Sequence, residues 1–132
     1  MENKDNKHLD LLGLFHYIVG GMFALFSCMP FIHVFLGIAM LSGKMLDDSG
    51  KPPPPFAGWI FVIVGLFFVV IGFSMALCII FAGRKLKQRK SRTFCMVVAG
   101  VECIFMPFGT VLGVFTLITL NKESIIQIFA ES

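Results

Sequence analysis

The sequence predicts an all-α, polytopic helical membrane protein, and two observations carry that prediction: its composition and its three long apolar blocks. Of the 132 residues, 57% are hydrophobic and 14% are charged. A soluble domain usually has about 45–50% apolar and about 25% charged residues. A soluble fold of this size would have too few polar residues to cover its large surface. We therefore expect residues 1–132 to form a single transmembrane domain.

The apolar blocks cover residues 11–41, 56–82 and 93–120. Each exceeds the roughly 20 residues that a helix needs to cross a hydrocarbon core. As straight helices they would measure about 46, 40 and 42 Å, and tilting or kinking can absorb the excess length. Asp10 precedes the first block and is expected to be the N-cap of its helix.

Prolines interrupt the first and third blocks, at Pro30 and Pro107. Each of these blocks can be one kinked span or a helical hairpin that turns at the proline. In the third block a hairpin arm would have about 13 residues and a length of about 20 Å, short of the core thickness of about 30 Å. Three kinked spans are therefore favoured. The alternative is four segments, with a re-entrant hairpin at Pro107 that is buried against protein.

The two connections between the blocks differ in charge. Residues 42–56 contain four consecutive prolines, which favour an extended polyproline II segment, and their two lysines are balanced by two aspartates. Residues 83–92 contain six basic residues and no acid: Arg84, Lys85, Lys87, Arg89, Lys90 and Arg92. Short loops rich in Lys and Arg remain in the cytoplasm. The protein is therefore expected to be multi-pass, with loop 83–92 on the cytoplasmic side of the membrane.

This basic loop is also expected to contact anionic lipid headgroups, which attract each nearby basic residue by about 1 kcal/mol. Nucleic-acid binding is not expected, because ten residues held between two spans offer no aromatic platform. The tail, 121–132, is predicted to be a short amphipathic helix in the membrane interface. In that helix Ile125, Ile128 and Phe129 share one face.

Glu102 is the charged residue that lies deep in an apolar block, about 14 Å along the helix from Thr93. Acids at such depth are costly and are candidates for function. Glu102 can be a proton or cation site, or a protonated side chain that hydrogen-bonds a neighbouring helix. His16 and His33 are the other polar candidates. His16 is nearer the depth of Glu102, which favours a Glu102–His16 pair. No spacing of ligands indicates a metal site.

Small residues indicate close helix packing. Gly58, Gly65 and Gly72 recur every seven residues, and Gly109 and Gly113 form a GxxxG step. Such patterns allow helices to approach closely in lipid. They can serve self-association between copies or packing within one chain, and the sequence leaves both open.

No motif indicates an enzyme or a cofactor. The chain has no phosphate-binding glycine loop, no HExxH and no CxxC. Its four cysteines lie inside apolar blocks and are expected to act as small packing residues: Cys28, Cys78, Cys95 and Cys103.

The segment Pro107-Phe108-Gly109-Thr110-Val111-Leu112-Gly113-Val114-Phe115-Thr116-Leu117 resembles a P-[FL]-G-T-x-L-G-[VI]-[YF]-T-L segment. That segment occurs near the C-terminus of a family of small, uncharacterised bacterial multi-span membrane proteins. The start of loop 83–92 and the start of the third block are also similar. The resemblance implies a bacterial cytoplasmic membrane protein, and it assigns no activity and no functional residue.

Two functions are consistent with these observations. The first is a small integral membrane protein that acts by helix association, as an oligomer or as an accessory subunit of a membrane complex. The second is a small oligomeric transporter or channel that uses Glu102 as a proton or cation coupling site. The glycine patterns favour the first function, and the acid deep in the third apolar block favours the second.

Overall fold

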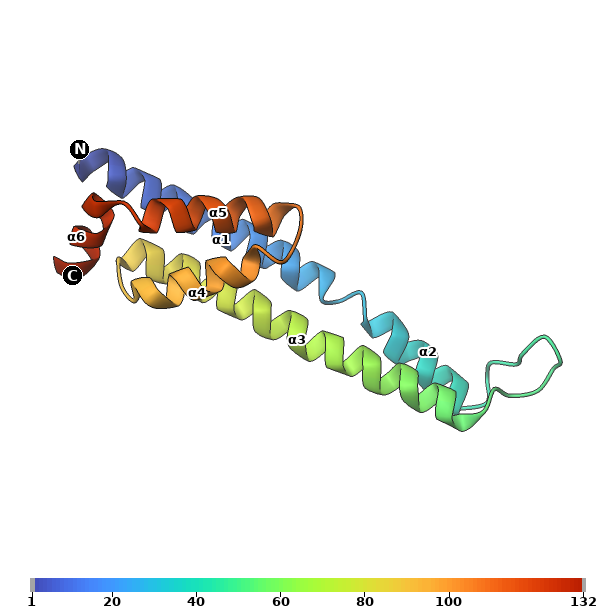
Figure 1. Ribbon diagram of the computed structural model, residues 1–132. Coiled ribbons are helices and arrows are strands. Elements are labelled where there is room, and N and C mark those ends of the chain that lie inside the picture. Colours follow the sequence, from blue (N-terminus) through green and yellow to red (C-terminus); the bar gives the residue numbers. More distant parts are fainter. Residues whose placement is uncertain (1, 132) are drawn as a thin grey trace. The chain divides into compact units, whose positions relative to one another are not determined.

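A computed structural model describes residues 2–131, and the regular structure in this part of the chain is entirely helical (Figure 1). The helices are α1 (Glu2–Phe26), α2 (Phe31–Leu41), α3 (Pro55–Gln88), α4 (Arg92–Glu102), α5 (Phe108–Leu120) and α6 (Glu123–Glu131). The predicted all-α fold class is confirmed.

Two segments are long and apolar enough to cross a membrane, Asn3–Leu41 and Pro55–Gln88. A third qualifies if α5 and α6 count as one span, although these two helices are bent by 77°. Large apolar side chains cover the outside of the helices; Leu25 is 74% exposed and Phe35 is 71% exposed. Apolar surface of this extent is unfavourable in water and is the surface that a bilayer covers.

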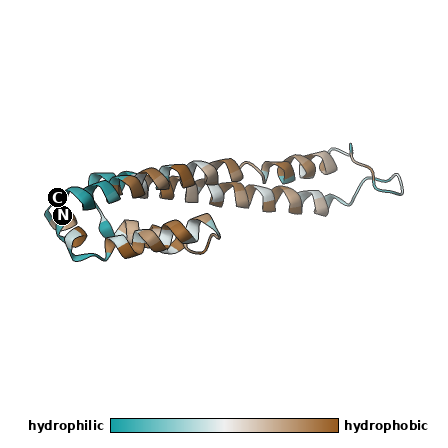
Figure 2. Ribbon diagram, turned by 90° about the horizontal axis from the view of Figure 1, so that it is seen from above, coloured by the Kyte–Doolittle hydropathy of each residue, from teal (hydrophilic) through white to brown (hydrophobic). Residues whose placement is uncertain are grey.

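The chain divides into two compact units. Unit 1 contains residues 1–22 and 76–132, and unit 2 contains residues 23–75. In unit 1, Figure 2 shows the hydrophilic residues gathered at the end where both chain termini are marked.

In unit 2, α1 ends at Phe26 and α2 begins at Phe31, because Pro30 cannot donate a backbone hydrogen bond. Residues 3–41 nevertheless qualify together as one candidate span, with a break in the helix at residues 27–30. The residues that join α2 to α3 are ordered around Asp47, whose Oδ1 accepts hydrogen bonds from the backbone N–H groups of Ser49 and Lys51 at 2.9 Å. These bonds stabilise the carboxylate and lower the pKa of Asp47.

Two helix boundaries in unit 1 differ from the prediction. Helix α1 begins at Glu2, so Asp10 lies inside the helix and is not its N-cap. Helix α3 continues through Gln88, so most of the basic segment is helical and the connection to α4 is only residues 89–91. Helix α3 extends into the basic segment because Arg, Lys, Leu and Gln are good helix formers. The chain then reverses through positive φ angles at Arg89 (54°) and Ser91 (55°).

The third block is a helical hairpin, in contrast to the kinked span that the sequence favoured. Helices α4 and α5 run side by side and are joined at residues 103–107 (Figure 1). The glycines of α5 allow this: a Cβ atom at Gly113 would press on the carbonyl oxygen of Ala99 and lie 2.7 Å from Cys103 Sγ. The Thr110 hydroxyl closes the turn by donating to the Cys103 carbonyl at 2.8 Å.

Hydrogen bonds from two arginines hold one end of unit 1 together. Arg92 donates from Nε to the carbonyl of Leu120 at 2.8 Å, and from Nη2 to Asn121 Oδ1 at 3.1 Å. Arg89 Nε donates to Asn6 Oδ1 at 2.8 Å. The start of α1, the end of α3 and both open ends of the hairpin therefore lie together.

The tail forms helix α6, as expected. Ile125 is fully buried and Ile128 and Phe129 are partly buried, so the predicted apolar face packs inward.

Candidate functional site

The site is a pair of fully buried polar side chains in unit 1. His16 lies on α1, Glu102 is the last residue of α4, and both side chains have 0% exposure. His16 Nε2 lies 3.3 Å from Glu102 Oε2. The pairing predicted from the depths of the two residues is therefore present.

The other ring nitrogen fixes where the protons of His16 lie. His16 Nδ1 is 2.8 Å from the carbonyl oxygen of Leu12. A carbonyl oxygen can only accept, so Nδ1 carries a hydrogen in this contact. The Nε2–Oε2 contact of 3.3 Å is within ion-pair distance but does not have hydrogen-bond geometry, and one further proton can lie either on the ring or on the carboxyl group. In both forms the pair as a whole is neutral, which is the state that an apolar environment favours.

Glu102 has unused capacity to accept hydrogen bonds. Both of its carboxyl oxygens are buried and have no hydrogen-bond partner among residues 2–131, and the same holds for His16 Nε2. Its place at the C-terminal end of α4 adds the partial negative charge of the helix terminus. His16 is thus the group that compensates a negative charge on Glu102, and separating the two would leave that charge uncompensated.

A close crossing of α1 and α3 positions the histidine. A Cβ atom at Gly83 would lie 2.9 Å from the carbonyl oxygen of Gly13 and 2.9 Å from His16 Cβ. Two turns further along, a Cβ atom at Gly20 would lie 2.7 Å from Ile80 Cγ1. The backbone of α3 therefore lies directly against the base of the imidazole side chain.

Gly13 and Gly83 were not predicted from the sequence to be part of the site, because Gly83 was assigned to the loop. A signal existed: Gly13 and Gly20 are seven residues apart, and Ala76 and Gly83 have the same spacing. Matching seven-residue spacings of small residues on two blocks indicate a helix crossing.

The hairpin positions the glutamate. A Cβ atom at Gly109 would press on the backbone carbonyl of Glu102 and lie 3.1 Å from Phe105 Cβ. The first turn of α5 therefore fixes the end of α4, where Glu102 is found. Further along, Cys95 is buried and its Sγ lies 3.7 Å from the carbonyl of Ala82, which ties α4 to α3.

His33 belongs to unit 2. Its side chain is exposed and its ring stacks on Phe61, with ring centroids 6.0 Å apart and an interplanar angle of 19°.

The remaining glycine candidates are used for packing within the chain. In unit 2, Cβ atoms at Gly58 and Gly65 would each lie 2.8 Å from an α2 side chain, that of Leu41 and of Val34 respectively, and a Cβ atom at Gly72 would overlap Ser27. In contrast, Cβ atoms at Gly21 and Gly100 would meet nothing within 4 Å. The predicted patterns thus serve contacts inside one chain.

The basic residues have mixed surroundings. Arg89 and Arg92 donate hydrogen bonds within unit 1, and Lys87 Nζ lies 5.2 Å from the centroid of the Tyr17 ring. Arg84 and Lys90 are exposed. Some basic residues of segment 83–92 therefore make contacts within unit 1, and others are exposed.

Within residues 2–131 no group of three or more His, Cys, Asp or Glu side chains is placed to hold a metal ion. The His16–Glu102 pair supplies two potential ligands, fewer than the three or four of a typical zinc site. Comparison of the chain with models of protein families, with curated proteins and with solved structures finds no match.

Proposed function

We propose that the protein is a small transporter or channel of a cytoplasmic membrane and that the His16–Glu102 pair is its proton-coupling site. The observation that carries this proposal is the 3.3 Å contact between two ionisable side chains with 0% exposure. Such a pair changes its net charge by one whenever it gains or loses a proton. A change of charge in an apolar site has a large free-energy cost. Gain or loss of a proton by the pair therefore favours a change in the conformation of the helices around it.

The α4–α5 hairpin is the proposed moving element. Its arms have 11 and 13 residues, which correspond to about 17 and 20 Å of helix, less than the thickness of a hydrocarbon core. Glu102 lies beside its turn and His16 lies on a different segment of the chain. Protonation that weakens the pair would release the turn of the hairpin from α1 while the arginine contacts hold its open end.

The proposed orientation puts the basic end of unit 1 in the cytoplasm. Lys and Arg near the ends of spans favour that side, and the exposed Arg84 and Lys90 would meet anionic headgroups there. Because the hairpin returns to its starting end, both termini would be cytoplasmic. The location in a bacterial membrane is proposed on the resemblance of residues 107–117.

Association with other copies or with a membrane partner is the second candidate function. The glycine patterns that favoured it are used inside the chain, and Gly21 and Gly100 are the described helical glycines at which an added methyl group would meet open space. An association surface built on close glycine contacts would have to include one of these two positions.

The test is proton flux in proteoliposomes that contain a trapped pH-sensitive dye. The purified protein is expected to increase the rate at which an imposed pH gradient decays, and Glu102→Gln is expected to abolish that increase. Glutamine keeps the size and hydrogen-bonding capacity of the side chain but cannot exchange a proton. Glu123→Gln is the control, because Glu123 is exposed on α6.

Flux that is the same in the wild type and in Glu102→Gln would contradict coupling and leave the pair a structural contact. Absence of flux in the wild type, together with a particle mass of several chains, would instead favour association. Thermal unfolding of each variant in detergent separates loss of function from loss of fold.

A further inference from the structure

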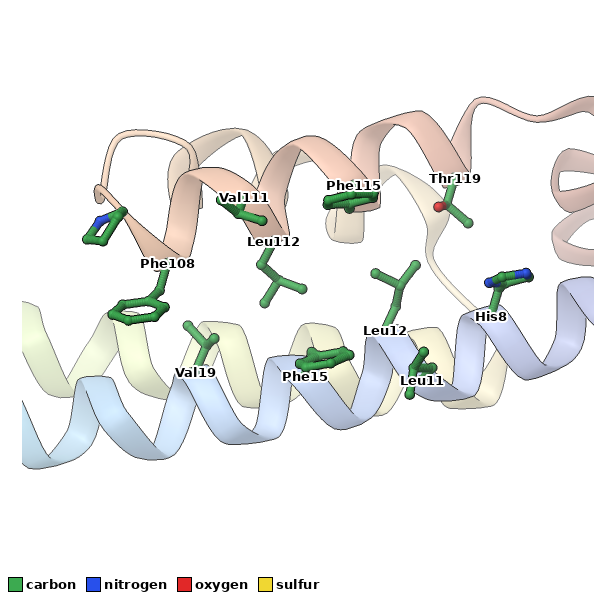
Figure 3. A pocket seen from close by; sticks show the side chains of 11 residues that line it. His8, Leu11, Leu12, Phe15, Val19, Phe108, Val111, Leu112, Phe115 and Thr119 are labelled. Carbon is green, nitrogen blue, oxygen red and sulfur yellow. The ribbon is translucent and has the colours of Figure 1, made fainter.

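Unit 1 contains a groove that the proposed coupling site does not use. It has a volume of about 640 Å³ and lies between the first part of α1 and α5 (Figure 3). This volume is within the range of about 300–1,000 Å³ that is typical of small-molecule sites. The lining residues on α1 include Leu11, Phe15 and Val19, and those on α5 include Phe108, Val111 and Phe115.

The groove is polar at one end only. Figure 3 shows His8 and Thr119 facing each other at one end, while Phe108 and Val19 lie at the other. From Phe108 to Thr119 the helix extends about 17 Å. An apolar slot with polar groups at a single end matches an amphiphile whose tail lies in the slot and whose headgroup lies at its mouth.

The mouth favours a negatively charged headgroup. Lys4 lies one helical turn before His8, so the two share a face of α1, and Lys122 follows the end of α5. Unit 1 has six acidic residues, Glu2, Asp5, Asp10, Glu102, Glu123 and Glu131, and nine basic residues: Lys4, Lys7, Arg84, Lys85, Lys87, Arg89, Lys90, Arg92 and Lys122. The net positive charge of unit 1 therefore favours anions over cations.

We propose that this groove binds one acyl chain of an anionic phospholipid, with the phosphate headgroup held at Lys4, His8, Thr119 and Lys122. The proposal does not depend on proton coupling, because none of these residues belongs to the His16–Glu102 pair. The two features are neighbours: Leu12 lines the groove, and its carbonyl oxygen is the partner of His16 Nδ1.

Quenching of a single tryptophan by brominated lipids tests this proposal. Trp59 is replaced by Phe, and Phe115→Trp puts an indole in the groove. Val114→Trp is the matched control, because Val114 lies on the same helix, is 43% exposed and is not among the groove residues. Each protein is reconstituted with acyl-brominated phosphatidylglycerol or acyl-brominated phosphatidylcholine in an otherwise unbrominated bilayer.

At position 115 we expect the anionic lipid to compete for the groove at least about fivefold better than the zwitterionic lipid. One contact with a basic residue at the membrane surface contributes about 1 kcal/mol, which corresponds to this ratio of affinities. At position 114 we expect little preference. In the Phe115→Trp protein, Lys4→Gln together with Lys122→Gln should remove most of the preference. Both lysines are exposed, so the fold should tolerate the change.

Equal quenching by the two lipids at position 115 would overturn the proposal, and so would an equal anionic preference at positions 114 and 115. Absence of quenching at position 115 would also overturn it, because the groove would then exclude lipid chains. A failed flux assay changes none of these outcomes, so the two proposals can fail separately.

Discussion

His16 and Glu102 are both fully buried, and each has the other as the neighbour that can compensate its charge. Removing one partner from a buried pair leaves the other uncompensated, whereas replacing both by apolar residues can be nearly neutral. The pair is therefore expected to show strong energetic coupling.

A double-mutant cycle measures this coupling. His16→Leu leaves the Glu102 carboxyl group without its partner, and Glu102→Leu leaves His16 Nε2 without its partner. We expect each single substitution to lower the free energy of unfolding by about 3–5 kcal/mol, and the double substitution to cost less than either single one. Unfolding by denaturant in detergent micelles, followed by circular dichroism, gives the four values. Additive effects would show that the two side chains do not interact.

At the residue scale, counting helix length was enough to pair Glu102 with His16 and not with His33. It succeeded because both residues are a similar number of turns from the same end of unit 1. It did not identify Gly13 and Gly83, because their signal is a matching seven-residue spacing of small residues on two blocks and Gly83 was assigned to the loop. Their role depends on how α1 and α3 cross, and one block's sequence does not contain that information.

The α4–α5 hairpin is the element that brings Glu102 to its position. Its close packing depends on Gly113, which lies against Ala99, and on Gly109, which lies against the end of α4. Gly100, on α4, has open space instead. The same substitution at these glycines should therefore have opposite effects.

Gly113→Ala should destabilise the protein by about 1–3 kcal/mol, because the added methyl group overlaps the backbone of α4. Gly100→Ala should be neutral or should stabilise by up to about 1 kcal/mol, because alanine favours helix and the methyl group meets nothing. Midpoints of thermal unfolding in detergent compare the two. Equal effects at both positions would contradict the hairpin contact.

At the element scale, the sequence predicted helices and their approximate places, and the errors are at their ends and at one turn. Helix α3 runs six residues past the expected end at residue 82 because basic residues are good helix formers. The hairpin was disfavoured because its arms are too short to cross lipid. That argument assumes that each helix faces lipid, whereas a re-entrant segment packed on protein has no such requirement.

For the whole molecule, composition and the long apolar blocks were sufficient to predict helices that can cross a membrane. The number of times the chain crosses the membrane depends on the third block. Hydropathy alone predicts that this block is one span. In the structure Arg92, at the start of α4, donates to Leu120 and Asn121 at the end of α5. The chain therefore leaves the hairpin at the end of unit 1 where it entered.

The side of the membrane that holds the C-terminal tail tests this arrangement most directly, since the buried pair and the groove both require the hairpin. Glu131→Cys and Ser49→Cys introduce single thiols at exposed positions in a variant whose four native cysteines are replaced. A membrane-impermeant maleimide is then applied to intact cells. We predict that the thiol at position 49 is labelled at once and that the thiol at position 131 is labelled only after the cells are opened. Labelling of position 131 in intact cells would mean that the third block crosses the membrane, and it would contradict the hairpin together with the site built on it.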